Sequence, residues 1–149
     1  MDHQWRTLQH RLSHAYDRFR HTVEQLAQGA RERLGVCGEW SPKEVVAHLA
    51  GWDREAARRF HQFMQSPTED IDYDLDGFNA RSVAARQHLS WEQTLDELDD
   101  AHQELQQAIA LVEPQHLEAD SRFFGWLEGR SGDYEEHTVQ IQAWLEECL

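Results

Sequence analysis

The chain has 149 residues, which suits a single domain, and carries 28 acidic against 14 basic side chains, for a formal net charge of -14. A charge of this sign repels nucleic-acid backbones and anionic lipid surfaces, so neither is an expected partner. The sequence has no apolar run long enough to span a membrane and no apolar leader at its start, so we expect a cytoplasmic protein.

The composition favours helix over strand. The sequence has only three prolines and eight glycines, and no stretch shows sustained alternation of apolar and polar residues. We therefore expect one all-α domain over residues 1–149, built as a four-helix bundle. The two cysteines, Cys37 and Cys148, are isolated in the sequence and are interpreted as free thiols.

The first helix is expected over residues 2–28, because apolar residues recur there at intervals of three and four. They are Trp5, Leu8, Leu12, Tyr16, Phe19, Val23 and Leu26. Histidines line the opposite face, where His10 and His14 have the spacing of a metal-chelating pair. We interpret these histidines as solvent-exposed, because they lie about 180° from the apolar face.

A second helix is expected over residues 42–65. Ser41 and Glu44 form a capping box at its start, and the residue between them at the first helical position is a proline. His48 lies about 90° from the centre of the apolar stripe of this helix, at about 100° per residue. We therefore expect its imidazole beside Trp52, at the edge of a cleft between helices.

Residues 66–77 are acidic and rich in turn formers, so they are expected to connect the second and third helices. A connection of this length exceeds what antiparallel neighbours need and indicates a crossover between helices two and three. The DxDxDG run from Asp72 matches the first half of an EF-hand loop, but Val83 stands where the bidentate carboxylate belongs. We interpret the run as a solvated acidic loop.

The third helical region is expected in two parts, over residues 78–86 and 90–112. Ser90 and Gln93 form a second capping box at the start of the later part. His102 lies inside the apolar stripe of that part, so it is interpreted as a core histidine bonded to a neighbour.

Pro114 is expected to end the third helical region, and residues 115–130 are expected to be irregular. They contain an aromatic cluster that we expect to fill the core. Its members are Phe123, Phe124 and Trp126. The last helix is expected over residues 132–147.

One group of side chains has the pattern of a metal site. His48 lies at the edge of the second helix, and Asp133 and His137 are four residues apart on one side of the last helix. Two imidazoles and a carboxylate would hold one divalent ion, zinc or nickel, and leave a position open for water or substrate. Asp133 has an alternative role, because with Glu136 it is suited to cap the start of the last helix.

The blocks GEWSPKEVVAHLAGWDREA, FNARSVAARQHLSWEQTLDELDDAHQEL and DYEEHTVQIQAWLEE resemble the DinB-like superfamily, most closely its ClbS/DfsB branch of colibactin self-protection proteins. The likeness spans residues 5–147 and implies a four-helix bundle with a crossover between helices two and three. In metal-binding members, one histidine of the AHLAGW helix and a HisxxxHis pair of the last helix hold the ion. His48 and His137 match this set, and Asp133 stands in place of the first histidine of the pair.

The resemblance implies an enzyme that acts on a small electrophile in an inter-helix cleft, as a hydrolase or a thiol-dependent transferase. With a metal, an activated water or thiolate would be the nucleophile. Without one, Glu55, Tyr134 and His137 are the candidate acid or base groups.

The alternative is a non-catalytic protein that binds an apolar or cationic small molecule, in a pocket lined by Trp52, Trp144 and nearby carboxylates. Asn79 is expected to face the crossover, where it would either hydrogen-bond a ligand or cap a helix. A structural bundle that forms a homodimer is the third hypothesis. The sequence names no substrate.

Overall fold

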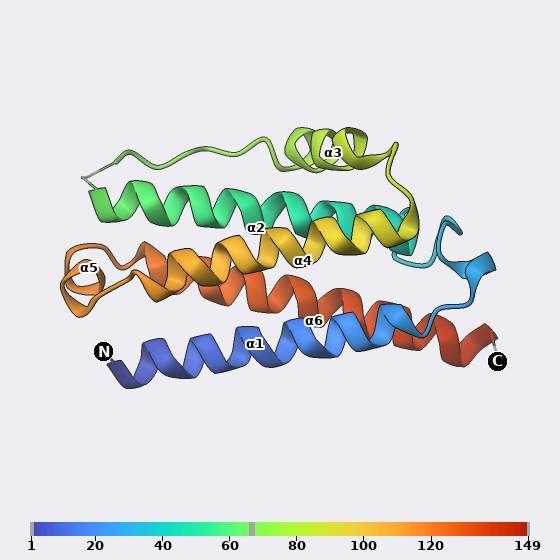
Figure 1. Cartoon of the computed structure of the whole chain (residues 1–149), viewed down its shortest axis with the longest axis horizontal. Coiled ribbons are helices and arrows are strands. Elements are labelled where there is room, and N and C mark those ends of the chain that lie inside the picture. The colour runs from blue at the N-terminus through green and yellow to red at the C-terminus, as the bar shows by residue number, and fades with distance from the viewer. Residues whose placement is uncertain (1, 66–67, 149) are drawn as a thin grey trace.

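The computed structural model describes residues 2–65 and 68–148, and within these residues the chain is helical without a β-strand. Four long helices lie side by side as a bundle (Figure 1): α1 (Asp2–Glu24), α2 (Pro42–Gln65), α4 (Trp91–Ala110) and α6 (Arg122–Cys148). Three short helices connect them: η1 (Gln28–Ala30), α3 (Leu75–Arg86) and α5 (Pro114–Ala119). None of the helices described is both long and apolar enough to cross a membrane.

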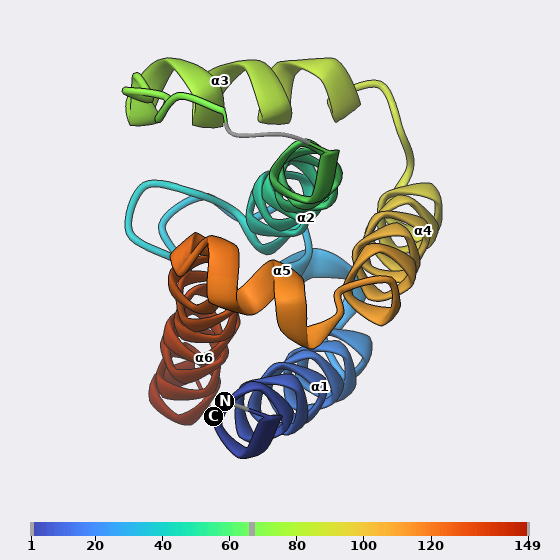
Figure 2. The ribbon, with the colours of Figure 1, turned by 90° about the vertical axis from the view of Figure 1, so that its left-hand side faces the viewer.

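The connection between α2 and α4 is the predicted crossover. In Figure 1, α2 and α4 run in the same direction, and so do α1 and α6. After α2 the chain returns along that helix before α3 begins, and Figure 2 shows α3 lying across α2. Residues 66 and 67 of the predicted connection lie outside the described residues. A Cβ at Gly51 of α2 would come within 2.2 Å of Ser82 Oγ, so the close packing of α3 on α2 requires a glycine there.

Local hydrogen bonds fix the starts of α2 and α4 as predicted. Glu44 N donates to Ser41 Oγ at 3.1 Å, and Ser41 N donates to Glu44 Oε1 at 3.1 Å. Ser90 and Gln93 make the same reciprocal pair of bonds. Both capping boxes are therefore formed.

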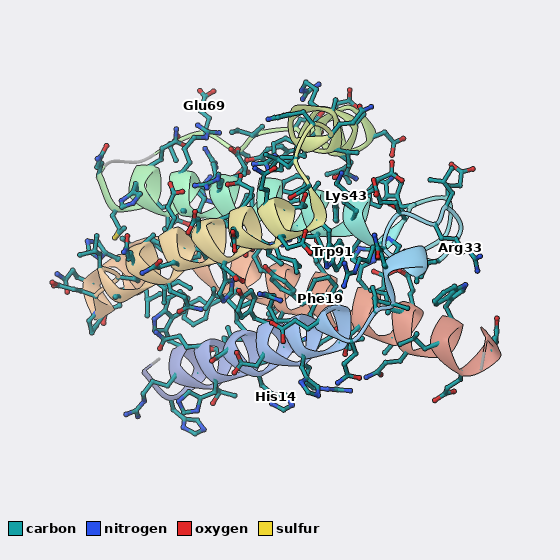
Figure 3. The ribbon with its side chains drawn as sticks, turned by 45° about the vertical axis from the view of Figure 1, so that its right-hand side comes forward. His14, Phe19, Arg33, Lys43, Glu69 and Trp91 are labelled. Atoms are coloured by element: carbon teal, nitrogen blue, oxygen red, sulfur yellow. The ribbon has the colours of Figure 1, made fainter. Side chains whose placement is uncertain are left out.

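The histidine face of α1 is exposed, as predicted. His3, His10, His14 and His21 are all exposed. Figure 3 shows His14 pointing away from the bundle and Phe19 pointing into it. The helix ends at Glu24, short of the predicted residue 28, because the next amides bond three residues back and tighten the chain into a turn.

The prediction of an irregular segment over residues 115–130 is wrong. α5 occupies part of it, and α6 begins at Arg122 rather than near residue 132. The helix persists through its glycines because Phe123 and Leu127 are fully buried at helical spacing. Phe123 packs in the core against Phe60, with ring centroids 5.2 Å apart, whereas Trp126 is only half-buried and faces a pocket.

A buried ionic network crosses the core between α2, α4 and α6. The carboxylate of Asp53 is fully buried and accepts bonds from Arg130 Nε at 2.8 Å and His102 Nδ1 at 2.9 Å, and from the Tyr134 hydroxyl. His102 is thus the bonded core histidine that the sequence predicts. Burial alone would raise the pKa of Asp53, but the charge of Arg130 and the bonds from His102 and Tyr134 hold that pKa below its usual value.

Replacing Asp53 with asparagine should lower the free energy of unfolding by about 3–5 kcal/mol at neutral pH, because Arg130 loses a buried partner. The pKa of Asp53 is lowered in the folded state, so its contribution is present above the ordinary aspartate pKa of about 4 and is lost as the pH falls further. Denaturant unfolding should show the difference between the two proteins narrowing below about pH 4.

The control is Asp100→Asn, an exposed position on α4 that should change stability by less than about 0.5 kcal/mol. Equal effects of the two substitutions would contradict a structural role for the buried network.

Candidate metal centre and its pocket

Three side chains from α2 and α6 converge in one place. His48 Nε2 lies 3.2 Å from Asp133 Oδ2, and His137 Nε2 lies 3.2 Å from Asp133 Oδ1. The two imidazole centroids are 5.4 Å apart, and one donor atom from each residue lies within 4.8 Å of the other two. Both imidazoles are buried, and the carboxylate is partly buried. The structure brings together the three residues that the sequence predicts as one site.

The tautomer of His48 follows from its second contact. Asn79 Oδ1 accepts the indole N–H of Trp52 at 2.7 Å, which fixes the amide oxygen on that side because indole nitrogen only donates. The same oxygen lies 3.0 Å from His48 Nδ1, so Nδ1 carries the hydrogen. In the neutral ring, Nε2 then presents a lone pair to the carboxylate of Asp133, and a cation or a proton is needed between them.

His137 is held in a similar way on the other side. Its Nδ1 lies 2.7 Å from Gln140 Oε1, which leaves Nε2 facing Asp133. Burial would lower the pKa of His137, but hydrogen bonds with Asp133, the Cys37 side chain and Gln140 raise it to about 10. A proton thus stabilises the metal-free site and must leave before a metal ion binds.

Asp133 is a central residue of α6, so its predicted alternative role as a helix cap is wrong. Arg130 Nη1 donates to Asp133 Oδ2 at 2.8 Å from one turn earlier on the helix. Burial would raise the pKa of Asp133, but bonds from His137 and His48 and the charge of Arg130 hold it well below its usual range. The carboxylate is therefore ionised and turned toward the two imidazoles.

These residues fit a divalent ion. Two imidazole nitrogens and one carboxylate oxygen are ligands that zinc accepts, and three protein ligands are typical of an open, catalytic site. Each histidine is oriented by a second hydrogen bond from the ring nitrogen that does not face the site, as metal-ligating histidines usually are. The three side chains therefore suit a divalent ion both in the chemistry of their donor atoms and in their convergence on one point.

A pocket of about 600 Å³ opens beside Asp133. Its lining comes from α2, from the start of α3 and from one face of α6. The lining residues are Trp52, Leu75, Arg122, Gly125, Trp126, Gly129, Arg130 and Asp133. The volume lies within the range usual for small-molecule sites. A ligand in this pocket would contact one side of the candidate metal centre.

The remaining predicted site residues lie in different places. Trp52 lines the pocket, as predicted, and Asn79 supports His48 instead of capping α3, which Asp74 caps. Glu55 is bonded to Arg58 and Tyr73, so its carboxylate is already engaged by these two side chains.

Two further predicted residues lie apart from the pocket. Tyr134 is fully buried, and its hydroxyl donates to Asp53 in the core, where burial raises its pKa well above the usual value. Trp144 lies two helical turns beyond His137, and the guanidinium of Arg33 lies 5.9 Å from its ring centroid. Neither side chain supports the acid–base or ligand-binding role expected from the sequence.

The sequence predictions missed several residues of the site, among them Arg130, Asp53, Gly125 and Gly129. A signal for Arg130 exists, because it stands three residues before Asp133 and would share its helix face once that helix is extended. Because residues 115–130 were predicted to be irregular, the helix face that contains the two glycines was not recognised.

Nitrogen-15 NMR of metal-free protein should show neutral His48 as the tautomer with hydrogen on Nδ1. In Asn79→Ala this preference should be lost, because the acceptor of that hydrogen is removed. His102 is an internal control, since Asp53 still fixes its tautomer. Hydrogen on Nε2 of neutral His48 in the unmodified chain would contradict the assignment.

Comparison with known proteins agrees with this architecture. The sequence profile described as the mycothiol maleylpyruvate isomerase N-terminal domain matches residues 12–142, and that domain is a helical bundle of the DinB-like superfamily. No curated protein and no solved structure gave a significant match. Because the match covers most of the chain and includes every residue of the candidate centre, the chain belongs to the mycothiol maleylpyruvate isomerase N-terminal domain family.

Proposed function

We propose that the chain is a metal-dependent enzyme that joins a small thiol to an electrophilic small molecule in the pocket beside Asp133. The observation that carries this proposal is the convergence of His48, Asp133 and His137 at the edge of that pocket. The family supports it, because its description names an isomerase that uses the thiol mycothiol. The same geometry serves a hydrolase if water replaces the thiol.

The three side chains would hold zinc or nickel, which when bound acts as a Lewis acid and lowers the pKa of a thiol or water at the open position. In the addition to a strained ring, a bond forms between the thiol sulfur and a ring carbon, the ring bond from that carbon to its leaving atom breaks, and the thiol proton ends on that leaving atom. Asn79 orients His48, and Arg130 keeps Asp133 ionised. The apolar walls of the pocket limit competition from water.

A closer kinship with the ClbS/DfsB branch is part of this proposal. It is supported by the WSPKEVVAHLAGW block, which contains His48 and Trp52. This kinship would make a strained, electrophilic ring the target. A non-catalytic binder is the second candidate, favoured by the engagement of Glu55 and Tyr134 in other contacts.

Calorimetric titration of tag-free, metal-free protein with zinc should give one equivalent per chain. His48→Ala and His137→Ala should each abolish this binding, and Asp133→His should tighten it. Asn79→Ala should weaken zinc binding by about 10- to 100-fold, because it removes the hydrogen-bond acceptor that orients the His48 ring. Affinity should fall as the pH drops, since protons compete for the imidazoles.

The control for the titration is a variant carrying His10→Ala and His14→Ala, which removes the exposed pair on α1. This variant should still bind one equivalent of zinc per chain with unchanged affinity. Loss of zinc binding in this control, or its persistence in His48→Ala, would contradict the assignment of the zinc site to His48, Asp133 and His137.

Zinc-loaded protein should accelerate the reaction of a low-molecular-weight thiol with a small neutral epoxide. The rate is measured as the loss of free thiol. His137→Ala should reduce the rate to background, whereas the His10→Ala, His14→Ala variant should keep it. Zinc binding without any acceleration, over a panel of thiols and electrophiles, would favour the non-catalytic binder.

A further inference from the structure

Two glycines of α6 create the floor of the pocket. Gly125 and Gly129 are one turn apart, and a Cβ built on either would meet no atom of the described residues within 4 Å. Neither has the positive φ that would require a glycine. Glycine is a poor helix former, so the fold itself gains nothing from these two positions. Their effect is a flat strip of backbone facing open space.

Aromatic rings stand beside this strip. Trp52 and Trp126 line the pocket with ring centroids 6.2 Å apart, and Tyr73 lies 5.2 Å from the first and 5.9 Å from the second. The bond from Trp52 Nε1 to Asn79 fixes one indole. A flat strip flanked by indoles accommodates a planar apolar group by stacking and by burial of its faces.

The pocket has two arginines, but both are already engaged. Arg122 donates through all three nitrogens, to Asp120 at 2.7 Å, to Asp70 at 2.6 Å and to the carbonyl of Thr68 at 2.9 Å. Its charge is therefore balanced by two carboxylates.

Arg130 is engaged in the same manner. Its nitrogens donate to Asp53 and Asp133, each at 2.8 Å, and to the Leu49 carbonyl at 3.4 Å. A ligand carboxylate or sulfonate would have to displace one of these partners, and it would also approach a chain whose formal net charge is -14.

From these features we infer that the pocket takes a planar, uncharged, largely apolar substrate, laid on Gly125 and Gly129 with one end toward Asp133. The inference rests on the proposed function, and it deepens that function by naming the class of the electrophile. It excludes small dianionic carboxylates as the preferred substrates of this chain.

The test uses two fluorescent probes with the same ring skeleton, neutral N-phenyl-1-naphthylamine and its sulfonated analogue 1-anilinonaphthalene-8-sulfonate. Fluorescence titration is carried out on the full chain with a chelator and again with one equivalent of zinc. The neutral probe should bind at one site per chain, at least tenfold more tightly than the sulfonate. Binding should persist with the chelator, because the pocket walls exist without the metal.

Gly129→Leu should lower the affinity for the neutral probe at least tenfold, because the leucine side chain fills the strip. Gly132→Leu is the matched control: it lies on the same helix, its added Cβ also meets no described atom within 4 Å, and it is outside the pocket lining. It should change the affinity less than threefold. Circular dichroism should show that both variants fold, because leucine is a better helix former than glycine.

Three other outcomes overturn the inference. Tighter binding of the sulfonate would contradict the uncharged class, and equal effects of the two leucine variants would contradict the location. Absence of probe binding, with zinc binding intact, would overturn the substrate class and leave the metal centre standing. Probe binding without any zinc binding would instead overturn the proposed metal chemistry and leave the pocket.

Discussion

The guanidinium of Arg130 lies between two carboxylates, and the candidate site depends on that arrangement. One partner, Asp53, belongs to the core network with His102 and Tyr134, and the other, Asp133, faces the two imidazoles. Removing either carboxylate would leave part of the buried guanidinium without its hydrogen-bond partner, which is costly. The network therefore ties the orientation of Asp133 to the packing of the bundle, so that core and site are stabilised together.

The last helix combines three roles along its length. Phe123 and Leu127 bury its first turns in the core, Gly125 and Gly129 leave a strip open on another face, and Asp133 with His137 supplies ligands further on. Each glycine costs about 1 kcal/mol of helix propensity relative to alanine, and the buried side chains offset that cost. A helix held by its core face can thus carry an open face for a ligand.

Helix periodicity predicted the bundle, the length of residues 66–77 predicted the crossover, and the positions of His48, Asp133 and His137 on their helices, together with the family resemblance, predicted that these side chains converge. Helix spacing and capping are local properties of the sequence. Helix periodicity failed where long-range partners decide the outcome. Tyr134 and Glu55 lie near the predicted helix faces, but Asp53 and Tyr73 occupy their polar atoms. Arg130 and Asp53 were missed because charged residues on a buried face run against the hydrophobic pattern.

X-ray absorption at the zinc edge of tag-free, zinc-loaded protein tests the central claim most directly. The account predicts a first shell of nitrogen and oxygen at about 2.0–2.2 Å with the scattering of two imidazoles. Replacing His48 with alanine should remove that signature. A shell containing sulfur at about 2.3 Å would place the ion on Cys37 instead, and an imidazole-free shell would place it on surface carboxylates. Either result would contradict a metal centre formed by His48, Asp133 and His137.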